Sequence, residues 1–441
     1  MRQASDTLTL AMTRLFPNTG TFRSLANYNY RLWAGGAIVS NVGTWMQRVA
    51  QDWLVLTQLT HNNASALGVV MALQFGPQML MLPFSGFAAD FFDRRKLLMV
   101  TQAAMGLCAL GLGLLTVTGL VELWHVYVFA FLHGCAAAFD APARQTFVSD
   151  LVGEADLPNA VALNSTSFNA ARMVGPALAG LLIAGVGTGW AFLTNALSFG
   201  GVLFSLMFLR VGDLHPSRRA VRAPGGFLAG FRYVWNRPDL RSMLLMLFLI
   251  GTFGMNFSIF ISTMAVTVFH AGAGGYGLLA SMMAIGTVTG ALLAAGRESP
   301  RIELLFTGAA VFALGCAMAA IMPNYWMFGG TLVVIGVSAL TITNSTNSLM
   351  QLSTEPAMRG RVMAIRLAIA LGGTPIGAPL VGWVADRFGP RWALGVAAAA
   401  GVSAAIVMIH YLAKHRRLRL SVAGGRLRVS MDEGEAFPLP R

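Results

Sequence analysis

The stretch Gly86-Phe-Ala-Ala-Asp90-Phe-Phe-Asp93-Arg94-Arg95-Lys96 decides how this chain is interpreted. It is a dense cluster of charges, and it lies between two long apolar segments, residues 66–89 and 97–118. Charged side chains are costly inside a bilayer, so they collect where a chain turns at a membrane face. The stretch therefore predicts a tight turn between two membrane-spanning segments.

The whole chain is too apolar for a soluble protein. Of its 441 residues, 56% are hydrophobic and 11% are charged, and its mean hydropathy is +0.64. Soluble domains carry about 25% charged residues. The apolar runs are long and continuous, which predicts spanning helices of roughly 20 residues each rather than alternating strands of about 10 residues.

The apolar segments form two groups of six, on either side of a basic linker. We expect an all-α membrane protein with twelve transmembrane helices in two pseudo-symmetric six-helix halves, which is how many transporters build a site at the midplane. The expected divisions are a cytoplasmic N-terminal tail (1–30), the N-terminal half (31–210), a cytoplasmic linker (211–238), the C-terminal half (239–413) and a cytoplasmic C-terminal tail (414–441). The C-terminal tail is basic, then acidic, and predicts disorder or surface association.

The net charge of +13 raises the possibility of nucleic-acid binding, but its placement argues against that partner. Most lysines and arginines fall in the tails, the linker and alternate loops, which is the positive-inside pattern of a membrane protein. The pattern predicts a multi-pass protein of the plasma (inner) membrane, with both termini in the cytoplasm.

An internal repeat supports two related halves. Gly175-Pro-Ala-Leu-Ala-Gly180 matches Gly377-Ala-Pro-Leu-Val-Gly382, and each lies at the same distance before a tryptophan, Trp190 or Trp392. Chance similarity between glycine-rich helices is the alternative, but several matches at one offset favour duplication.

Four stretches resemble the exporter branch of the major facilitator superfamily that includes enterobactin (siderophore) exporters and macrolide efflux proteins. They are Asn41-Val-Gly-Thr-Trp45-Met-Gln-Arg48-Val-Ala-Gln-Asp52-Trp53, Ala138-Phe-Asp140-Ala-Pro142-Ala-Arg144-Gln145, Asn159-Ala-Val-Ala-Leu-Asn164 and Ser167-Phe-Asn169-Ala-Ala-Arg172-Met-Val-Gly175-Pro176. The resemblance implies a secondary active transporter that exports a small amphipathic molecule by alternating access, without a cofactor. It leaves open whether the substrate is a siderophore, a macrolide-like drug or another metabolite.

The opening stretch resembles the superfamily signature between helices 2 and 3. That resemblance implies a conformational latch formed by Gly86, Asp90, Arg94 and Arg95, with Arg144 of helix 4 as a candidate partner. Phe91 and Asp93 depart from the usual pattern, and a cluster that merely anchors the topology is the alternative.

A second motif concerns the direction of transport. Gly175, Pro176 and Gly180 resemble the helix-5 motif of antiporters, which favours export. Ordinary close packing of small residues is the alternative.

Ionisable residues inside spans are functional candidates because they are costly there. Arg48 and Asp52 are one helical turn apart, as are Asp140 and Arg144, and Arg172 has no acid within a turn. We expect every deep charge to lie in the N-terminal half. The candidate polar residues for a substrate or proton site are Arg48, Asp52, Asp140, Arg172, Gln74, Asn164 and Asn169.

Each deep charge has two interpretations. Asp52 and Asp140 could carry protons, or each could form a permanent ion pair with its neighbouring arginine. Asp140→Asn is accordingly expected to lose proton-driven efflux while folding normally. Arg172 could bind an anionic substrate or pair across helices with Asp140.

Other functional classes have less support. No nucleotide-binding loop, catalytic constellation or metal-ligand spacing is apparent, so we expect no enzyme activity and no metal. The expected partners are the small-molecule substrate, protons and membrane lipid, and the expected state is a monomer. Import of a metabolite and a non-transporting membrane scaffold are the alternative functions.

Overall fold

A computed structural model describes residues 20–215, 227–296, 302–415, 418–423 and 426–431. The expected tails and linker therefore lie partly outside the described residues. The helices up to the linker are η1 (Arg23–Ala26), α2 (Tyr28–Trp53), η2 (Leu54–Leu59), α3 (Ala64–Leu80), α4 (Leu82–Phe91), α5 (Arg94–Val117), α6 (Leu123–Leu151), α7 (Leu157–Val186), α8 (Thr188–Met207) and η3 (Val211–Asp213). After the linker come α9 (Phe227–Trp235), α10 (Pro238–Leu249), η4 (Ile250–Gly254), α11 (Phe257–Thr263), η5 (Met264–Val268), α12 (Ala273–Ala295), α13 (Glu303–Ile321), α14 (Tyr325–Ser353), α15 (Pro356–Phe388) and α16 (Pro390–His415).

Ten of the described helical segments are long and apolar enough to cross a membrane. They are α5 to α8, the continuous run from α10 to η5, and α12 to α16. Two further segments complete the order expected from sequence: α2, and the pair α3–α4, which breaks at Met81 between Pro77 inside α3 and Pro83 at the start of α4. The chain is a multi-pass, all-α membrane protein, and these segments are consistent with twelve spans.

The C-terminal tail differs from the sequence-based expectation. Strands β1 (Leu418–Ala423) and β2 (Arg426–Met431) form an antiparallel pair in which Leu418 lies opposite Met431. Leucine or valine alternates with polar residues in both segments, and this two-residue period favours strands. The expectation of disorder was therefore wrong for these two segments, and surface association of the tail stays a prediction.

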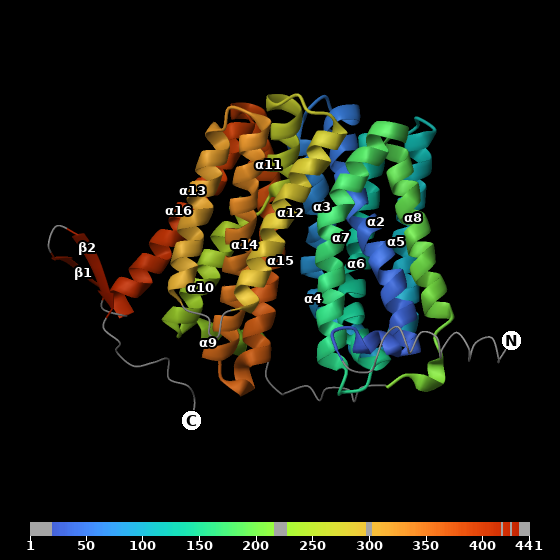
Figure 1. The fold of residues 1–441 in the computed structure, drawn as a ribbon, viewed down its shortest axis with the longest axis horizontal. Coiled ribbons are helices and arrows are strands. Elements are labelled where there is room, and N and C mark those ends of the chain that lie inside the picture. Colours follow the sequence, from blue (N-terminus) through green and yellow to red (C-terminus); the bar gives the residue numbers. More distant parts are fainter. Residues whose placement is uncertain (1–19, 216–226, 297–301, 416–417, 424–425, 432–441) are drawn as a thin grey trace. The chain divides into compact units, whose positions relative to one another are not determined.

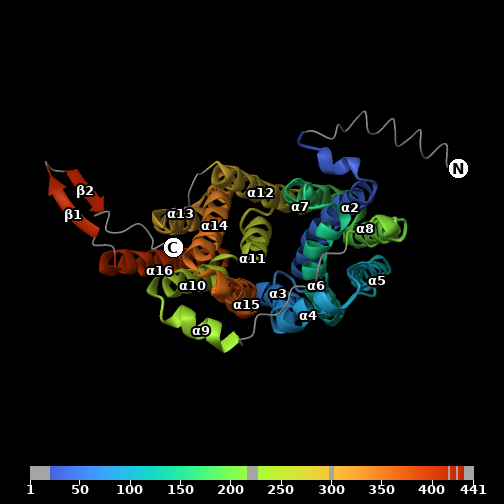
Figure 2. The same cartoon turned by 90° about the horizontal axis from the view of Figure 1, so that it is seen from below.

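The chain forms two compact units. The described parts of residues 1–60, 77–222 and 271–281 form unit 1, and those of 61–76, 223–270 and 282–441 form unit 2. In unit 1, α2 packs against α7 and α8, and α5 packs against α6 and α8 (Figures 1 and 2). In unit 2, α13 packs against α14 and α16, and α15 packs against η4.

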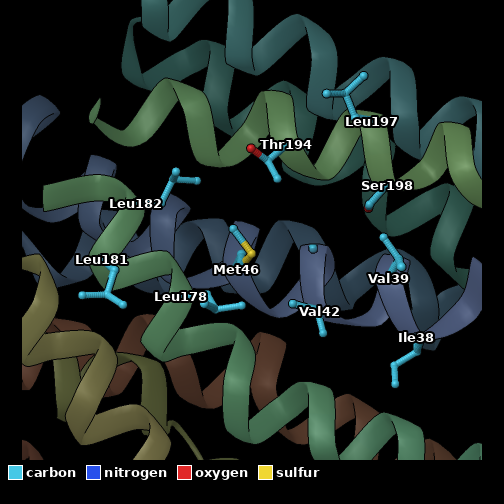
Figure 3. Close-up of a pocket in the computed structure, with 11 residues that line it drawn as sticks. Ile38, Val39, Val42, Met46, Leu178, Leu181, Leu182, Thr194, Leu197 and Ser198 are labelled. Carbon is cyan, nitrogen blue, oxygen red and sulfur yellow. The ribbon is translucent and has the colours of Figure 1, made fainter. Parts of the chain in front are cut away.

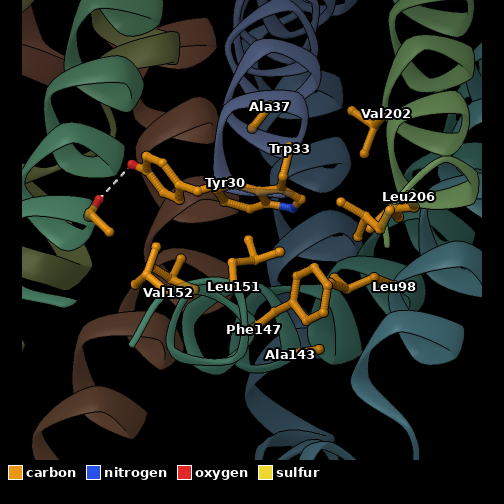
Figure 4. Packing of buried hydrophobic residues seen from close by; sticks show 13 residues of the cluster. Tyr30, Trp33, Ala37, Leu98, Ala143, Phe147, Leu151, Val152, Val202 and Leu206 are labelled. Atoms are coloured by element: carbon orange, nitrogen blue, oxygen red, sulfur yellow. Dashed lines mark hydrogen bonds between the residues drawn. The ribbon is translucent and has the colours of Figure 1, made fainter. Parts of the chain in front are cut away.

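One end of unit 1 is held by a buried apolar cluster (Figure 4). Most of its members come from α2, α5, α6, α7 and α8, with Tyr30, Trp33 and Phe147 as the largest side chains. The Tyr30 hydroxyl donates to the Ala160 carbonyl at 2.8 Å, so this buried polar group is satisfied. The cluster fixes the helices that carry the charged residues described below.

The repeated glycine motif packs in a similar way in both units. A Cβ on Gly175 would lie 2.6 Å from Trp45 Cβ, so α7 can approach α2 only because no side chain is present. Likewise, a Cβ on Gly377 would collide with the Thr252 carbonyl of η4. In each unit the motif therefore brings a helix onto the first long helical run of its half, which supports the repeat inferred from sequence.

Candidate functional site

The residues of helix α2 lie in two different environments, one apolar and one charged. Val42, Gly43 and Met46 line an apolar groove of about 800 Å³ together with residues of α7 and α8 (Figure 3). Trp45 and Arg48 instead take part in the charged contacts described below. None of the groove-lining residues is ionisable, so the groove and the charged residues are separate features.

Asp140 is the centre of a hydrogen-bond network in unit 1. Its Oδ1 accepts from Thr101 Oγ1 at 2.9 Å and from Gln102 Nε2 at 2.6 Å. Its Oδ2 accepts from Arg144 Nε at 3.0 Å and from Arg144 Nη2 at 2.9 Å. Arg144 Nη1 also donates to Asn41 Oδ1 at 3.2 Å, which ties α6 to α2.

This network confirms the ion pair between Asp140 and Arg144. A carboxylate offers only acceptors, and here both of its oxygens face donors. The alternative pairing of Arg172 with Asp140 was wrong, because no such ion pair occurs among the described residues.

Asp52 makes a different contact. Its side chain is buried, and its Oδ2 accepts from the Tyr276 hydroxyl at 2.6 Å. The Tyr276 ring stacks on Trp53, with the ring centroids 6.4 Å apart. Tyr276 lies in the part of α12 that belongs to unit 1, and no sequence motif pointed to it.

Two arginines lie beside one tryptophan ring. The guanidinium carbons of Arg48 and Arg172 are 4.7 Å and 5.4 Å from the centroid of Trp45. Phe168 packs edge-on against the same indole, with a centroid distance of 5.8 Å. Trp45 thus brings the deep charges of α2 and α7 together.

Two buried groups were missed from sequence. His133 on α6 is 7% exposed, lies within electrostatic range of Arg48 and Asp140, and has no hydrogen-bond partner for Nδ1 among the described residues. Arg366 of α15 is also buried and donates to the Thr343 carbonyl at 3.1 Å. Since Arg366 belongs to the C-terminal half, the expectation that every deep charge lies in the N-terminal half was wrong.

The three uncharged candidates are divided between the two units. Gln74 is buried in the part of α3 that belongs to unit 2. Asn169 donates to the Ser165 carbonyl of its own helix at 2.8 Å, and Asn164 is half-buried on the same helix, α7. Their contact with a substrate stays a prediction.

The predicted latch residues are held mainly by contacts inside unit 1. Arg94 forms an ion pair with Asp150 at 2.7 Å, and Arg95 donates to the Leu206 carbonyl at the end of α8 at 2.7 Å. Asp93, which departs from the superfamily pattern, caps α5 by accepting from the Lys96 amide at 3.0 Å.

The other latch residues give a mixed result. Arg144 pairs with Asp140, as described above. A Cβ on Gly86 would meet no described atom within 4 Å, so packing in this structure does not require glycine there. The side chain of Asp90 lies outside the described part, so its role in a latch stays a prediction.

The antiporter-like motif has a clear packing role. Gly175 admits Trp45, and a Cβ on Gly180 would lie 2.8 Å from the Ala273 carbonyl at the start of α12. A Cβ on Gly277 would lie 2.3 Å from the Pro176 carbonyl oxygen, which is too close for a side chain. The motif therefore allows close backbone contact at the position where Tyr276 reaches Asp52.

An acidic residue caps a helix in unit 2. Asp386 of α15 accepts from the backbone amides of Ala64 and Ser65 at 2.6 Å and 2.8 Å, at the first turn of α3. An anion is favoured at a helix N-terminus, so this contact stabilises the approach of α15 to α3. It was not anticipated, because nothing in the sequence links two positions so far apart.

Comparisons with known proteins agree with this architecture. A family model described as "Transmembrane secretion effector" matches residues 19–420. The chain is 28% identical to the multidrug efflux pump Tap of Mycolicibacterium fortuitum, over 80% of this chain and 88% of that protein. It is 23% identical to the staphyloferrin A transporter of Staphylococcus aureus (strain NCTC 8325 / PS 47), over 86% of this chain and 95% of that protein. It is 25% identical to the enterobactin exporter EntS of Shigella flexneri, over 83% of this chain and 87% of that protein.

Solved structures share the fold at low identity. A transporter of the POT family in complex with 5-aminolevulinic acid superposes with a TM-score of 0.71 and 11% identity, covering 91% of this chain and 98% of that one. The nucleoside transporter NupG superposes with a TM-score of 0.69 and 12% identity, covering 87% and 99%. These likenesses establish the transporter fold and carry no information about the substrate.

Proposed function

Because this chain belongs to the transmembrane secretion effector family, an exporter branch of the major facilitator superfamily, we propose that it exports a small amphipathic molecule in exchange for protons. The family consists of membrane transporters rather than enzymes. The relatives named above are a multidrug efflux pump and two siderophore transporters, which supports a siderophore or a drug-like molecule as the substrate. Alternating access across the plasma membrane, by a monomer with both termini in the cytoplasm, completes the proposal.

The observation that carries the proposal is the set of buried and half-buried charges on the helices of unit 1. Arg48, Asp52, Asp140 and Arg172 lie on α2, α6 and α7, where the cost of a charge has to be offset by pairing or by function. A purely structural membrane protein has no need of so many ionisable groups in its interior.

Asp52 is the better candidate for the proton carrier. A tyrosine hydroxyl can donate to a carboxylate and can also accept from a protonated carboxyl group, so Tyr276 suits both states of Asp52. A guanidinium can only donate. Arg144 donates twice to Oδ2 of Asp140, so a proton on that oxygen would face donors, and this bidentate ion pair favours the structural role for Asp140.

Transport into everted membrane vesicles tests the proposal. Vesicles containing the wild-type protein should accumulate a siderophore or drug probe when their interior is acidified, and a protonophore should abolish this accumulation. Asp52→Asn should remove the proton dependence while leaving a normal amount of protein in the membrane. Accumulation that ignores the protonophore would contradict proton exchange, and a lack of accumulation for every probe would contradict transport.

A further inference from the structure

The two arginines beside Trp45 leave an excess of positive charge in the interior of unit 1. Its half-buried cations are Arg48, Arg144 and Arg172, and its buried acids in the same region are Asp52 and Asp140. Asp140 is paired with Arg144, and Asp52 follows Arg48 by one helical turn. One positive charge therefore remains without an acidic counterpart among these residues.

Arg172 is the arginine that remains. Within the described residues it forms no ion pair, and its contact is with the Trp45 ring, at 5.4 Å from the centroid. Arg48, a second cation over the same ring, acts on Arg172 as a like charge. A cation–π contact compensates only part of the cost of a buried charge. An anion bound to the Arg172 guanidinium would offset this excess charge and weaken the repulsion from Arg48.

The surroundings of this position suit an anionic ligand with an aromatic or planar part. The aromatic rings of Trp45 and Phe168 lie next to the two guanidinium groups and make this position partly apolar. His133, whose buried Nδ1 has no partner in the described part of the chain, adds a group that can donate in one tautomer. Gly175 maintains this arrangement because it allows α7 to lie against Trp45.

We propose that Trp45, Arg48 and Arg172, with His133 beside them, form a subsite for the acidic group of the exported molecule. The ligand class is an amphipathic molecule that carries a carboxylate or a comparable planar anion. Guanidinium groups bind such anions through paired hydrogen bonds, which a neutral or cationic molecule cannot accept in the same way. This inference rests on the proposed function and narrows its substrate class.

The test uses a matched pair of probes, an aromatic carboxylic acid dye and its methyl ester. The wild-type protein, reconstituted in phosphatidylcholine vesicles, should export the acid in preference to the ester. Arg172→Gln should lower the acid-to-ester ratio by about tenfold, as expected for the loss of a charge-assisted hydrogen bond. Arg172→Lys should restore part of this ratio, because it keeps the charge without the planar fork. Arg391→Gln serves as a matched control, since that arginine donates to the Ala320 and Met322 carbonyls.

A binding measurement separates failure of the subsite from failure of transport. The dissociation constant of the acid dye for the purified full-length protein should rise about tenfold in Arg172→Gln, and thermal melting should verify that the variant is folded. Equal handling of acid and ester by the wild type, or an unchanged dissociation constant in Arg172→Gln, would overturn the subsite. Binding that depends on Arg172 without any export would uphold the subsite and contradict the proposed function. If Arg172→Gln fails to fold, the comparison of Arg172→Lys with the wild type decides the matter.

Discussion

Replacing Asp140 by asparagine should destabilise the protein as well as impair export. The asparagine keeps one acceptor oxygen but turns an NH₂ group towards donors that a carboxylate now accepts from. Removing one partner of a buried ion pair costs roughly 3–5 kcal/mol. Since the Arg144 side chain is 22% exposed, the lower end applies, about 3 kcal/mol.

This cost can be converted into a melting temperature. An unfolding entropy of about 2.1 cal/mol/K per residue over 441 residues makes 3 kcal/mol equal to about 3 °C. Helices persist when a membrane protein unfolds in detergent, so the entropy is smaller and the shift is larger. The melting temperature of the purified protein should therefore fall by at least about 3 °C, in contrast to the sequence-based expectation of normal folding.

A double-mutant cycle isolates the interaction. Asp140→Asn, Arg144→Gln and the double variant are melted under identical conditions, and the double variant should be more stable than the sum of the two single effects by about 1–3 kcal/mol. An Asp140→Asn protein that melts like the wild type, yet has lost proton-driven efflux, would refute the structural role and restore Asp140 as a proton carrier.

Three further predictions concern packing and contacts. Gly175→Ala places a methyl group 2.6 Å from a neighbouring Cβ and should lower the free energy of unfolding, measured by thermal melting, by about 1–3 kcal/mol. Gly185→Ala on the same helix has nothing within 4 Å of the new methyl group and should leave the free energy of unfolding unchanged. Equal effects of the two substitutions would refute the packing argument. Tyr276→Phe removes the hydroxyl that donates to the buried carboxylate of α2 and should shift the pH dependence of efflux with little loss of protein; an unchanged pH profile would count against it. Paired cysteines at Ser65 and Asp386 should block export once joined by a short thiol crosslinker, relative to the same variant without crosslinker; unchanged export after crosslinking would show that α3 and α15 do not separate during transport.

Much of the fold could be predicted from the sequence because it depends on composition and period. The long apolar runs predict spanning helices, and the charge cluster at Gly86–Lys96 predicts a turn at the membrane face. The repeated glycine motif predicts two related halves. The ion pair of Asp140 with Arg144 was also within reach, because one helical turn separates the two residues. The break at Met81 follows from the prolines on either side of it.

Contacts between distant parts of the chain could not be predicted. Tyr276 reaches Asp52, and Asp386 reaches the start of α3, only because glycines allow two helices to touch. His133 gave no signal beyond being a histidine in an apolar run. Arg366 was missed although an arginine inside a predicted span is itself a signal.

The glycine-based approaches have a consequence for the rate of the transport cycle. At Gly180 and Gly382 the neighbouring atoms are backbone atoms of Ala273 and Ala64, so no side chain on the glycine side has to be withdrawn when the surfaces part. Helices that touch in this way can separate without a change of rotamer on that side. The contacts therefore stabilise one conformation but add little to the activation barrier for the change to the next conformation. Bulkier residues at these two positions should slow turnover even in variants that still fold normally.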